Sequence, residues 1–258
     1  FHPGFTAPVA STLYAISDEL IRELNLASHG FDPAAAILPL VGLSPEREPV
    51  FIDGYPGQQT VRGASAQDAA AFPGYQGQLD LFSRALAPFW QKAMPAVGDR
   101  APRSLLTYAQ LAMKLRLLGR EDMLEFFRVA TLPMRDWVEE HFDDELLKAT
   151  LCWDGLVGSK LAPRSPNQAM LTLLARRAGR HAGEHGIPVS GVNSFVNSLT
   201  AAAREAGAVI RTRSPVARLL IDGGDNGMRC TGVRLESGEE IEASRVVSGA
   251  DPKTTFLD

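Results

Sequence analysis

The chain lacks a long hydrophobic run, has few cysteines and carries no block of like charges. No apolar segment approaches the roughly 18 residues that cross a bilayer, and no secretory signal opens the sequence. The two cysteines, Cys152 and Cys230, are too far apart for a metal or redox motif, which favours a reducing, cytoplasmic location. The net charge is −4 over 258 residues, with lysine and arginine scattered, so we expect no nucleic-acid partner.

Phosphate-binding and hydrolase motifs are missing as well. The sequence contains neither G-x-x-x-x-G-K-[ST] nor G-x-G-x-x-G, so it carries no phosphate loop of its own, and no G-x-S-x-G marks a nucleophilic serine. The stretch from His181 to His185 has the H-x-x-E-H spacing of some zinc sites. Gly183 and Gly186 weaken a helix there and Pro188 ends it, so we interpret the stretch as a polar helix end without metal.

The composition, 45% hydrophobic and 22% charged, is that of a globular protein with a substantial core. Three regions follow one another: a mixed segment over 1–63, a helical domain over 64–186, and an α/β segment over 187–258. The first residue is Phe1 and both ends resemble interior sequence, so we expect a piece of a longer protein.

Periodicity and helix breakers predict the elements of the first two regions. Ser17 caps a short helix that Gly30 stops, and two apolar runs, 36–41 and 50–52, predict strands. Helices are expected over 79–94 (kinked at Pro88), 102–118, 121–142 (divided at Pro133), 143–157 and 167–178. The helix over 102–118 carries an apolar face formed by Leu105, Leu106, Ala109, Met113 and Leu117.

In the third region the spacing of apolar residues changes to one typical of strands. After a loop over 186–191 we expect a helix over 192–206 and strands over 208–212 and 216–221. A hairpin over 229–235 and 239–243 and a buried strand over 245–248 complete the region. The predicted class is therefore α/β, with an α+β arrangement within this chain.

Two clusters in the helical region could be functional, but a structural role is the stronger interpretation. Large apolar side chains could line a ligand tunnel, although such residues fill cores by default: Phe126, Phe127, Met134, Trp137, Phe142 and Trp153. Five carboxylates could include an acid–base pair, although their density is typical of a solvated helix junction: Glu139, Glu140, Asp143, Asp144 and Glu145.

Linked motifs in the last 70 or so residues resemble a known family. They are S-G-V-N-S-F from Ser190, A-G-A-V-I from Ala206, S-P-V-A-R-L from Ser214, T-G-V-R-L from Thr231, S-G-E-E-I from Ser237 and A-S-R-V-V-S-G-A-D-P from Ala243. In this order they resemble the phytoene-desaturase-like FAD-dependent oxidoreductases, in the branch typified by pyridine nucleotide-disulfide oxidoreductase domain-containing protein 2. The opening F-H-P-G-F is similar to the segment after that family's first flavin-contacting motif.

The resemblance implies a fold and a cofactor. It implies a helical substrate domain inserted in the β-rich remainder of a Rossmann-type FAD domain whose first βαβ unit is absent from this chain. Val216 matches the position whose backbone meets the adenine, and Ser248, Gly249 and Ala250 match a loop approaching FAD. Gly191 is retained from the family's Gly-Gly-Met-Gly turn, where this sequence has Val192 and Asn193 instead of the last two residues. Turn and hairpin structure alone would also account for these glycines.

Three functions stay open at this stage. The first is the central portion of an FAD-dependent oxidoreductase that oxidises an apolar or amine-type small molecule by hydride transfer, with no catalytic residue named and the chain alone inactive. The others are a non-catalytic binding or oligomerisation module of the same fold and an amine-oxidase-like flavoenzyme. Self-association and peripheral membrane contact are further partner hypotheses.

Overall fold

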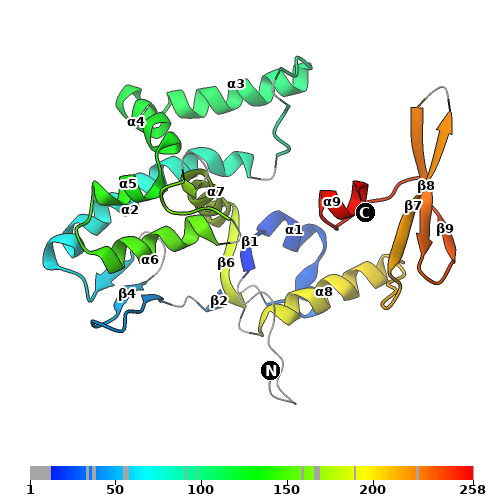
Figure 1. The fold of residues 1–258 in the computed structure, drawn as a ribbon, viewed down its shortest axis with the longest axis horizontal. Coiled ribbons are helices and arrows are strands. Elements are labelled where there is room, and N and C mark those ends of the chain that lie inside the picture. Colours follow the sequence, from blue (N-terminus) through cyan, green and yellow to red (C-terminus); the bar gives the residue numbers. More distant parts are fainter. Residues whose placement is uncertain are drawn as a thin grey trace. The chain divides into compact units, whose positions relative to one another are not determined.

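A computed structural model describes residues 13–32, 35–36, 39–54, 58–90, 92–96, 98–157, 160–165, 169–188, 190–224 and 227–257. The chain divides into two compact units between Ala202 and Ala203, inside the helix α8 (Val192–Glu205). Figure 1 shows the order of the elements along the chain.

The first sheet joins two segments that are far apart in the sequence. Its strand order is β1 (Leu13–Ser17), β6 (Gly183–Pro188) and β2 (Ala35–Ala36), and both pairings are antiparallel. The loop expected over 186–191 is therefore wrong for residues 186–188, which belong to β6, whereas residues 190 and 191 lie in a turn. The strand escapes local prediction because its backbone partners come from the start of the chain.

The helix α1 (Asp18–Glu23) follows β1 and begins as predicted. The Ser17 hydroxyl accepts hydrogen bonds from the backbone N–H groups of Glu19, at 3.1 Å, and Leu20, at 3.3 Å. After the short helix η1 (Leu26–His29), Gly30 turns the chain with a φ of 86°, a left-handed value that favours glycine. A small core beneath these elements contains Ile16, Ile21, Leu26 and Phe31, with Phe195, Leu199 and Ala202 of α8 packed against it.

A second antiparallel sheet contains β3 (Leu40–Gly42), β4 (Val50–Asp53) and β5 (Thr60–Arg62), in that order. The strand expected over 50–52 is confirmed. The strand expected over 36–41 is divided, because Ala36 ends β2 in the first sheet whereas Leu40 begins β3 in this one. Val50 and Ile52 of β4 are buried in the main core.

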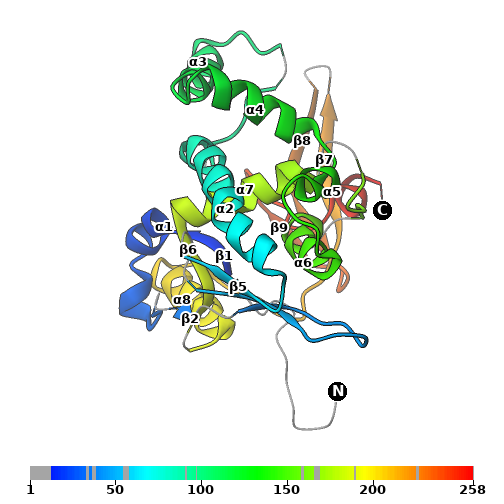
Figure 2. The ribbon, with the colours of Figure 1, turned by 90° about the vertical axis from the view of Figure 1, so that its left-hand side faces the viewer.

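Seven helices of the described chain form the helical layer (Figure 2). They are α2 (Ala66–Leu86), η2 (Ala87–Phe89), α3 (Pro102–Arg116), α4 (Arg120–Thr131), α5 (Met134–Glu139), α6 (Glu145–Leu156) and α7 (Ala169–Ala182). The division at Pro133 is confirmed, since α4 ends before it and α5 begins after it. Aromatic rings fill the centre of the layer, with the centroids of Tyr75 and Trp137 4.7 Å apart. The main core thus lies among α2, α5, α6 and α7.

The apolar face of α3 does not enter this core. Leu105, Leu106, Met113 and Leu117 are exposed, and Leu115 is the one residue of α3 that is buried. The helix meets the core through Leu115 instead, and Tyr108 adds polar contacts to the preceding segment. The Tyr108 hydroxyl donates to the carbonyl oxygens of Pro95 and Ala96, at 3.1 and 3.0 Å. The apolar face predicted over 102–118 is therefore present but exposed.

The second unit contains an antiparallel meander, β7 (Val216–Gly224), β8 (Gly227–Leu235) and β9 (Glu240–Glu242). It confirms the strands expected over 216–221, 229–235 and 239–243. The strands expected over 208–212 and 245–248 are wrong: both segments are irregular, and Val247 is 95% exposed. A buried strand needs neighbours for its backbone groups, and none of the described residues pairs with these segments.

Helices and small sheets are thus mixed, as the predicted class requires. Within the described ranges, no helix combines the length and apolar composition that crossing a bilayer demands.

Candidate functional site

The loop matched to a cofactor contact lies between the meander and the helix α9 (Pro252–Phe256). The Ser248 hydroxyl lies 2.9 Å from that of Thr255 and accepts a hydrogen bond from the Ala250 N–H at 3.2 Å. Asp251 caps α9 by accepting from the N–H of Thr254 at 3.1 Å. These bonds give the loop a definite path while its side chains stay exposed.

The backbone at Gly249 is open to a ligand. A Cβ added there would meet no heavy atom within 4 Å, so a cofactor can approach the peptide groups closely. Val216, the position matched to the adenine contact, begins β7 opposite Leu235, and its side chain is 54% exposed. Exposed apolar carbon at Val216 and open backbone at Gly249 are each compatible with contact to a dinucleotide, which such sites bind through peptide groups.

Gly191 lies in the other unit, in the turn between β6 and α8. Its φ of 76° is left-handed, its N–H donates to the Pro188 carbonyl at 2.8 Å, and its own carbonyl accepts from the Ser194 hydroxyl at 2.7 Å. A Cβ would meet nothing within 4 Å there either. The turn conformation alone therefore explains this glycine, and the open space leaves room for a ligand.

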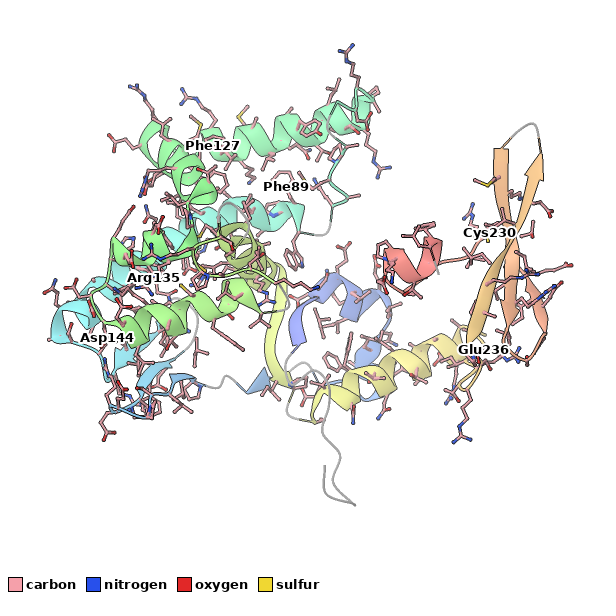
Figure 3. The ribbon with its side chains drawn as sticks, viewed as in Figure 1. Phe89, Phe127, Arg135, Asp144, Cys230 and Glu236 are labelled. Atoms are coloured by element: carbon pink, nitrogen blue, oxygen red, sulfur yellow. The ribbon has the colours of Figure 1, made fainter. Side chains whose placement is uncertain are left out.

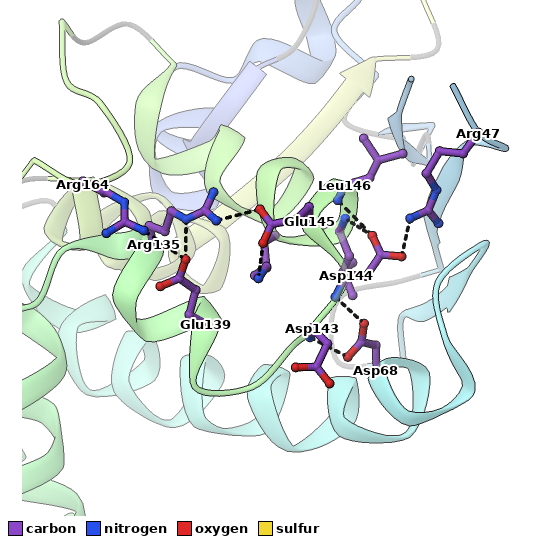
Figure 4. A network of polar contacts seen from close by, with 11 residues as sticks. Arg47, Asp68, Arg135, Glu139, Asp143, Asp144, Glu145, Leu146 and Arg164 are labelled. Atoms are coloured by element: carbon purple, nitrogen blue, oxygen red, sulfur yellow. Dashed lines mark hydrogen bonds and ion pairs between the residues drawn. The ribbon is translucent and has the colours of Figure 1, made fainter. Parts of the chain in front are cut away.

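The acidic cluster forms a network of ion pairs at the α5–α6 junction (Figure 4). Arg135 bridges Glu139 and Glu145, both at 2.6 Å. Hydrogen bonds from Arg135 lower the pKa of Glu139, and those from Lys148 and Arg135 lower the pKa of Glu145. A general acid needs a raised pKa, so these two carboxylates serve structure. The interpretation as a helix junction is confirmed for them.

The junction also rests on a carboxylate that the sequence analysis did not single out. Asp68, at the start of α2, is 1% exposed and accepts the backbone N–H groups of Asp143 at 3.0 Å and Asp144 at 2.9 Å. Asp144 in turn caps α6 (Figure 4). A buried acid near the start of a helix is a weak signal by itself, and its partners lie about 75 residues further along the chain.

Most of the aromatic cluster is core, as expected. Phe126, Met134, Trp137 and Phe142 are buried, whereas Phe127 and Trp153 are about half exposed. The H-x-x-E-H stretch is divided between α7, which holds His181, and β6, which holds Glu184 and His185. The two histidines therefore do not share one helix, and the helix-end interpretation holds only for the first. Among the described residues no group of potential ligands could hold a metal.

The helical unit also contains an apolar groove that the sequence analysis missed. It lies between η2 and α3 and has a volume of about 490 Å³. Phe89 is the last residue of η2 and lies below α3 in the view of Figure 3. The sequence held part of a signal, because residues 100–120 contain five basic residues but no acidic one. The structure adds that leucines of this segment are exposed.

Comparison with known proteins identifies the family. A family model described as "Flavin containing amine oxidoreductase" matches residues 20–255. "Pyridine nucleotide-disulfide oxidoreductase domain-containing protein 2" of Mus musculus is 27% identical over an alignment of 276 positions, which covers 99% of this chain and 47% of that protein. Its Rattus norvegicus counterpart is 26% identical over 275 residues, with the same coverage of both chains.

A more distant relative matches a shorter segment. The "zeta-carotene-forming phytoene desaturase" of Myxococcus xanthus is 42% identical over 64 residues, 25% of this chain and 12% of that protein. No solved structure matches. The chain spans about half the length of the mammalian relatives. These matches confirm the resemblance, and the mixed helix and sheet structure agrees with an α/β flavin-binding fold. Because the family model covers most of the sequence, the chain belongs to the flavin containing amine oxidoreductase family, whose cofactor is FAD.

Proposed function

We propose that this chain is the central portion of an FAD-dependent oxidoreductase, in which an inserted helical domain, residues 64–186, binds the substrate and residues 187–258 contact the cofactor. The observation that carries the proposal is the family match over residues 20–255, which includes both the helices and the meander. The activity of the whole protein is part of the proposal, since the chain spans 47% of its mouse relative.

Several residues would hold the cofactor. Val216 would offer backbone and exposed apolar carbon to the adenine, and the loop over 248–250 would approach through its open peptide groups. The turn at Gly191 leaves space for a further contact. The sequence contains no phosphate loop, so we assign no residue of this chain to the pyrophosphate.

The reaction would be hydride removal from an apolar or amine-type substrate, and bound FAD supplies the hydride acceptor. The chain's own contribution would be to orient the substrate and exclude water. Glu139 and Glu145 are ion-paired and have lowered pKa values, so they hold no proton at neutral pH. Positioning rather than proton transfer is therefore the role we assign to the helical domain.

The cofactor proposal is tested on protein purified from its complete reading frame. We expect a yellow protein that releases FAD on denaturation. A Gly249→Leu variant should weaken FAD binding, because the new side chain fills the open space above the loop. Gly223→Leu is the matched control, since that glycine also has no atom within 4 Å of its Cβ. A colourless protein that takes up no FAD would overturn the proposal, and equal affinity in both variants would remove the 248–250 loop from the site.

The substrate class is tested by anaerobic bleaching of the flavin. The family description points to amines, whereas the Myxococcus relative is named for a carotene-forming desaturase. Bleaching by primary or secondary amines would select the amine-oxidase-like alternative. Bleaching by apolar polyenes and not by amines would select C–H oxidation.

A specific observation favours one alternative, a non-catalytic assembly module. Val209, Met228 and Val247 are each at least 84% exposed, so the second unit leaves apolar surface uncovered. A module of this kind would be colourless and would self-associate. Sedimentation with and without FAD measures the oligomeric state of the purified protein and shows whether flavin sediments with it. Flavin retained at every oligomeric state would select the oxidoreductase, whereas a colourless assembly would select the module.

A further inference from the structure

The groove between η2 and α3 has the size and lining of a site for an apolar chain. Its volume of about 490 Å³ lies within the roughly 300–1,000 Å³ of small-molecule sites. The surface inside it is almost entirely carbon. Pro88 and Phe89 contribute it on one side, and Ala109 and Met113 of α3, with Leu117 directly after the helix, on the other. An apolar chain would cover side chains that the described structure leaves in water.

Two lysines line the same groove. Lys92 lies over the Phe89 ring, with Nζ 5.4 Å from the centroid, and donates to Oε1 of Gln110 at 2.9 Å. Lys114 also lines the groove. Within the described ranges neither ammonium has a carboxylate partner, although many arginines of this acidic chain do. A neutral amide leaves the charge of Lys92 uncompensated, so both cations can meet an anion.

The surroundings reinforce this charge pattern. From residue 100 to residue 120 the chain has five basic residues and no acidic one, while its net charge is −4. Two lysines therefore border an apolar groove, within a part of the chain that has an excess of positive charge. An anion with an apolar tail satisfies both features. A wholly apolar ligand would form no ion pair with the lysines, and a small anion would leave the apolar surface of the groove exposed to water.

We propose that the groove between η2 and α3 binds a single-chain amphipathic carboxylate, with the alkyl chain on Phe89, Met113 and Leu117 and the carboxylate between Lys92 and Lys114. None of the residues that line the groove is among those assigned to FAD. It does not rest on the proposed function, since binding here needs neither flavin nor turnover.

The test is isothermal titration calorimetry of dodecanoate, below its micelle concentration, into protein from the complete reading frame. We expect saturable binding at one site per chain. Lys114→Gln should weaken it roughly three- to tenfold, the range of a partly exposed ion pair. Dodecanol, which has the same chain and no charge, should bind the two proteins equally.

A second pair of variants separates the groove from the rest of α3. Met113→Glu places a carboxylate inside the groove and should weaken dodecanoate binding more than tenfold. Leu106→Glu is the matched control, since Leu106 is an equally exposed residue of α3 that does not line the groove. Far-ultraviolet circular dichroism shows that each variant is folded.

Three outcomes would overturn the proposal. The first is no saturable heat of binding, as expected if another segment of the protein covers the groove. The second is equal loss of affinity in Met113→Glu and Leu106→Glu. The third is binding to anionic phospholipid vesicles but not to monomeric dodecanoate, which would assign the exposed face of α3 to a membrane surface.

Discussion

Arg47 and Asp144 are 97 residues apart in the sequence, yet Nη1 of Arg47 lies 2.6 Å from Oδ2 of Asp144. The other oxygen of the same carboxylate accepts the N–H groups of Leu146 and Leu147, both at 2.9 Å. One side chain therefore begins α6 and ties it to the segment between β3 and β4.

This arrangement predicts that Asp144→Ala lowers the free energy of unfolding by about 1–2 kcal/mol, mainly through the lost helix cap. Asp144→Asn should cost less, because an amide oxygen still caps the helix while the charge opposite Arg47 is lost. Urea unfolding followed by tryptophan fluorescence measures both. Equal losses in the two variants would assign the stability to the ion pair instead of the cap.

Gly155 of α6 marks a close contact between helices. A Cβ at this position would lie 2.5 Å from Sδ of Met134 and 2.7 Å from the carbonyl oxygen of Ala169. Gly155→Ala should therefore destabilise the protein by about 1–3 kcal/mol through overpacking. Gly77→Ala in α2 meets nothing within 4 Å and should stabilise by about 0.5–1 kcal/mol. Thermal unfolding of the pair tests the packing, and a neutral Gly155→Ala variant would contradict it.

His141 should make stability depend on pH. Burial lowers its pKa, and its Nε2 atom is buried without a hydrogen-bond partner among the described residues. Its ring packs edge-on against Tyr75 and Trp137, with centroids 5.4 and 5.2 Å away. Between the ordinary value of about 6.5 and the lowered one, the unfolded chain binds more protons than the folded one. Stability is therefore lost as the pH falls through this window.

His141→Phe retains a ring at this position and should remove that part of the pH dependence. Urea unfolding at pH values of about 7.5 and about 5.5 measures the difference in free energy for both proteins. An unchanged difference in the variant would show that carboxylates, rather than this imidazole, cause the acid sensitivity.

The two cysteines should differ in reactivity. Burial raises the pKa of the Cys152 thiol to about 11, and the residue is 2% exposed, whereas Cys230 in β8 is partly exposed. Because the thiolate is the nucleophile, iodoacetamide should modify Cys230 well before Cys152. Mass spectrometry of timed samples measures the order. Simultaneous modification would mean that the core around α6 opens readily.

Local sequence signals predicted the elements whose causes are local. Pro133 separates α4 from α5 because proline cannot continue a helix, and Ser17 begins α1 because its hydroxyl can accept the first free N–H groups. The meander from Val216 onward followed from alternation and the turn at Gly238. The residues that cause these elements to form lie within or next to them in the sequence.

Elements that depend on distant partners were predicted poorly. Residues 183–188 contain two glycines and a proline, yet they form β6 because β1 and β2 pair with them. Residues 245–248 have a strand-like composition but no neighbouring strand in the described chain. The spacing over 102–118 predicted the apolar face of α3 but not its exposure, because periodicity identifies an apolar face but not what covers it. The groove was missed for the same reason.

The pairing of β1 with β6 also has a consequence for synthesis. Strand β1 cannot find its partner until residues 183–188 have left the ribosome, on the order of ten seconds after β1 itself at ordinary elongation rates. The helices between them can form and pack during that interval, since their contacts are nearer in sequence. The β1–β6–β2 sheet therefore forms late, and a nascent chain stalled before residue 183 would leave β1 and β2 as unpaired edges that other chains could capture.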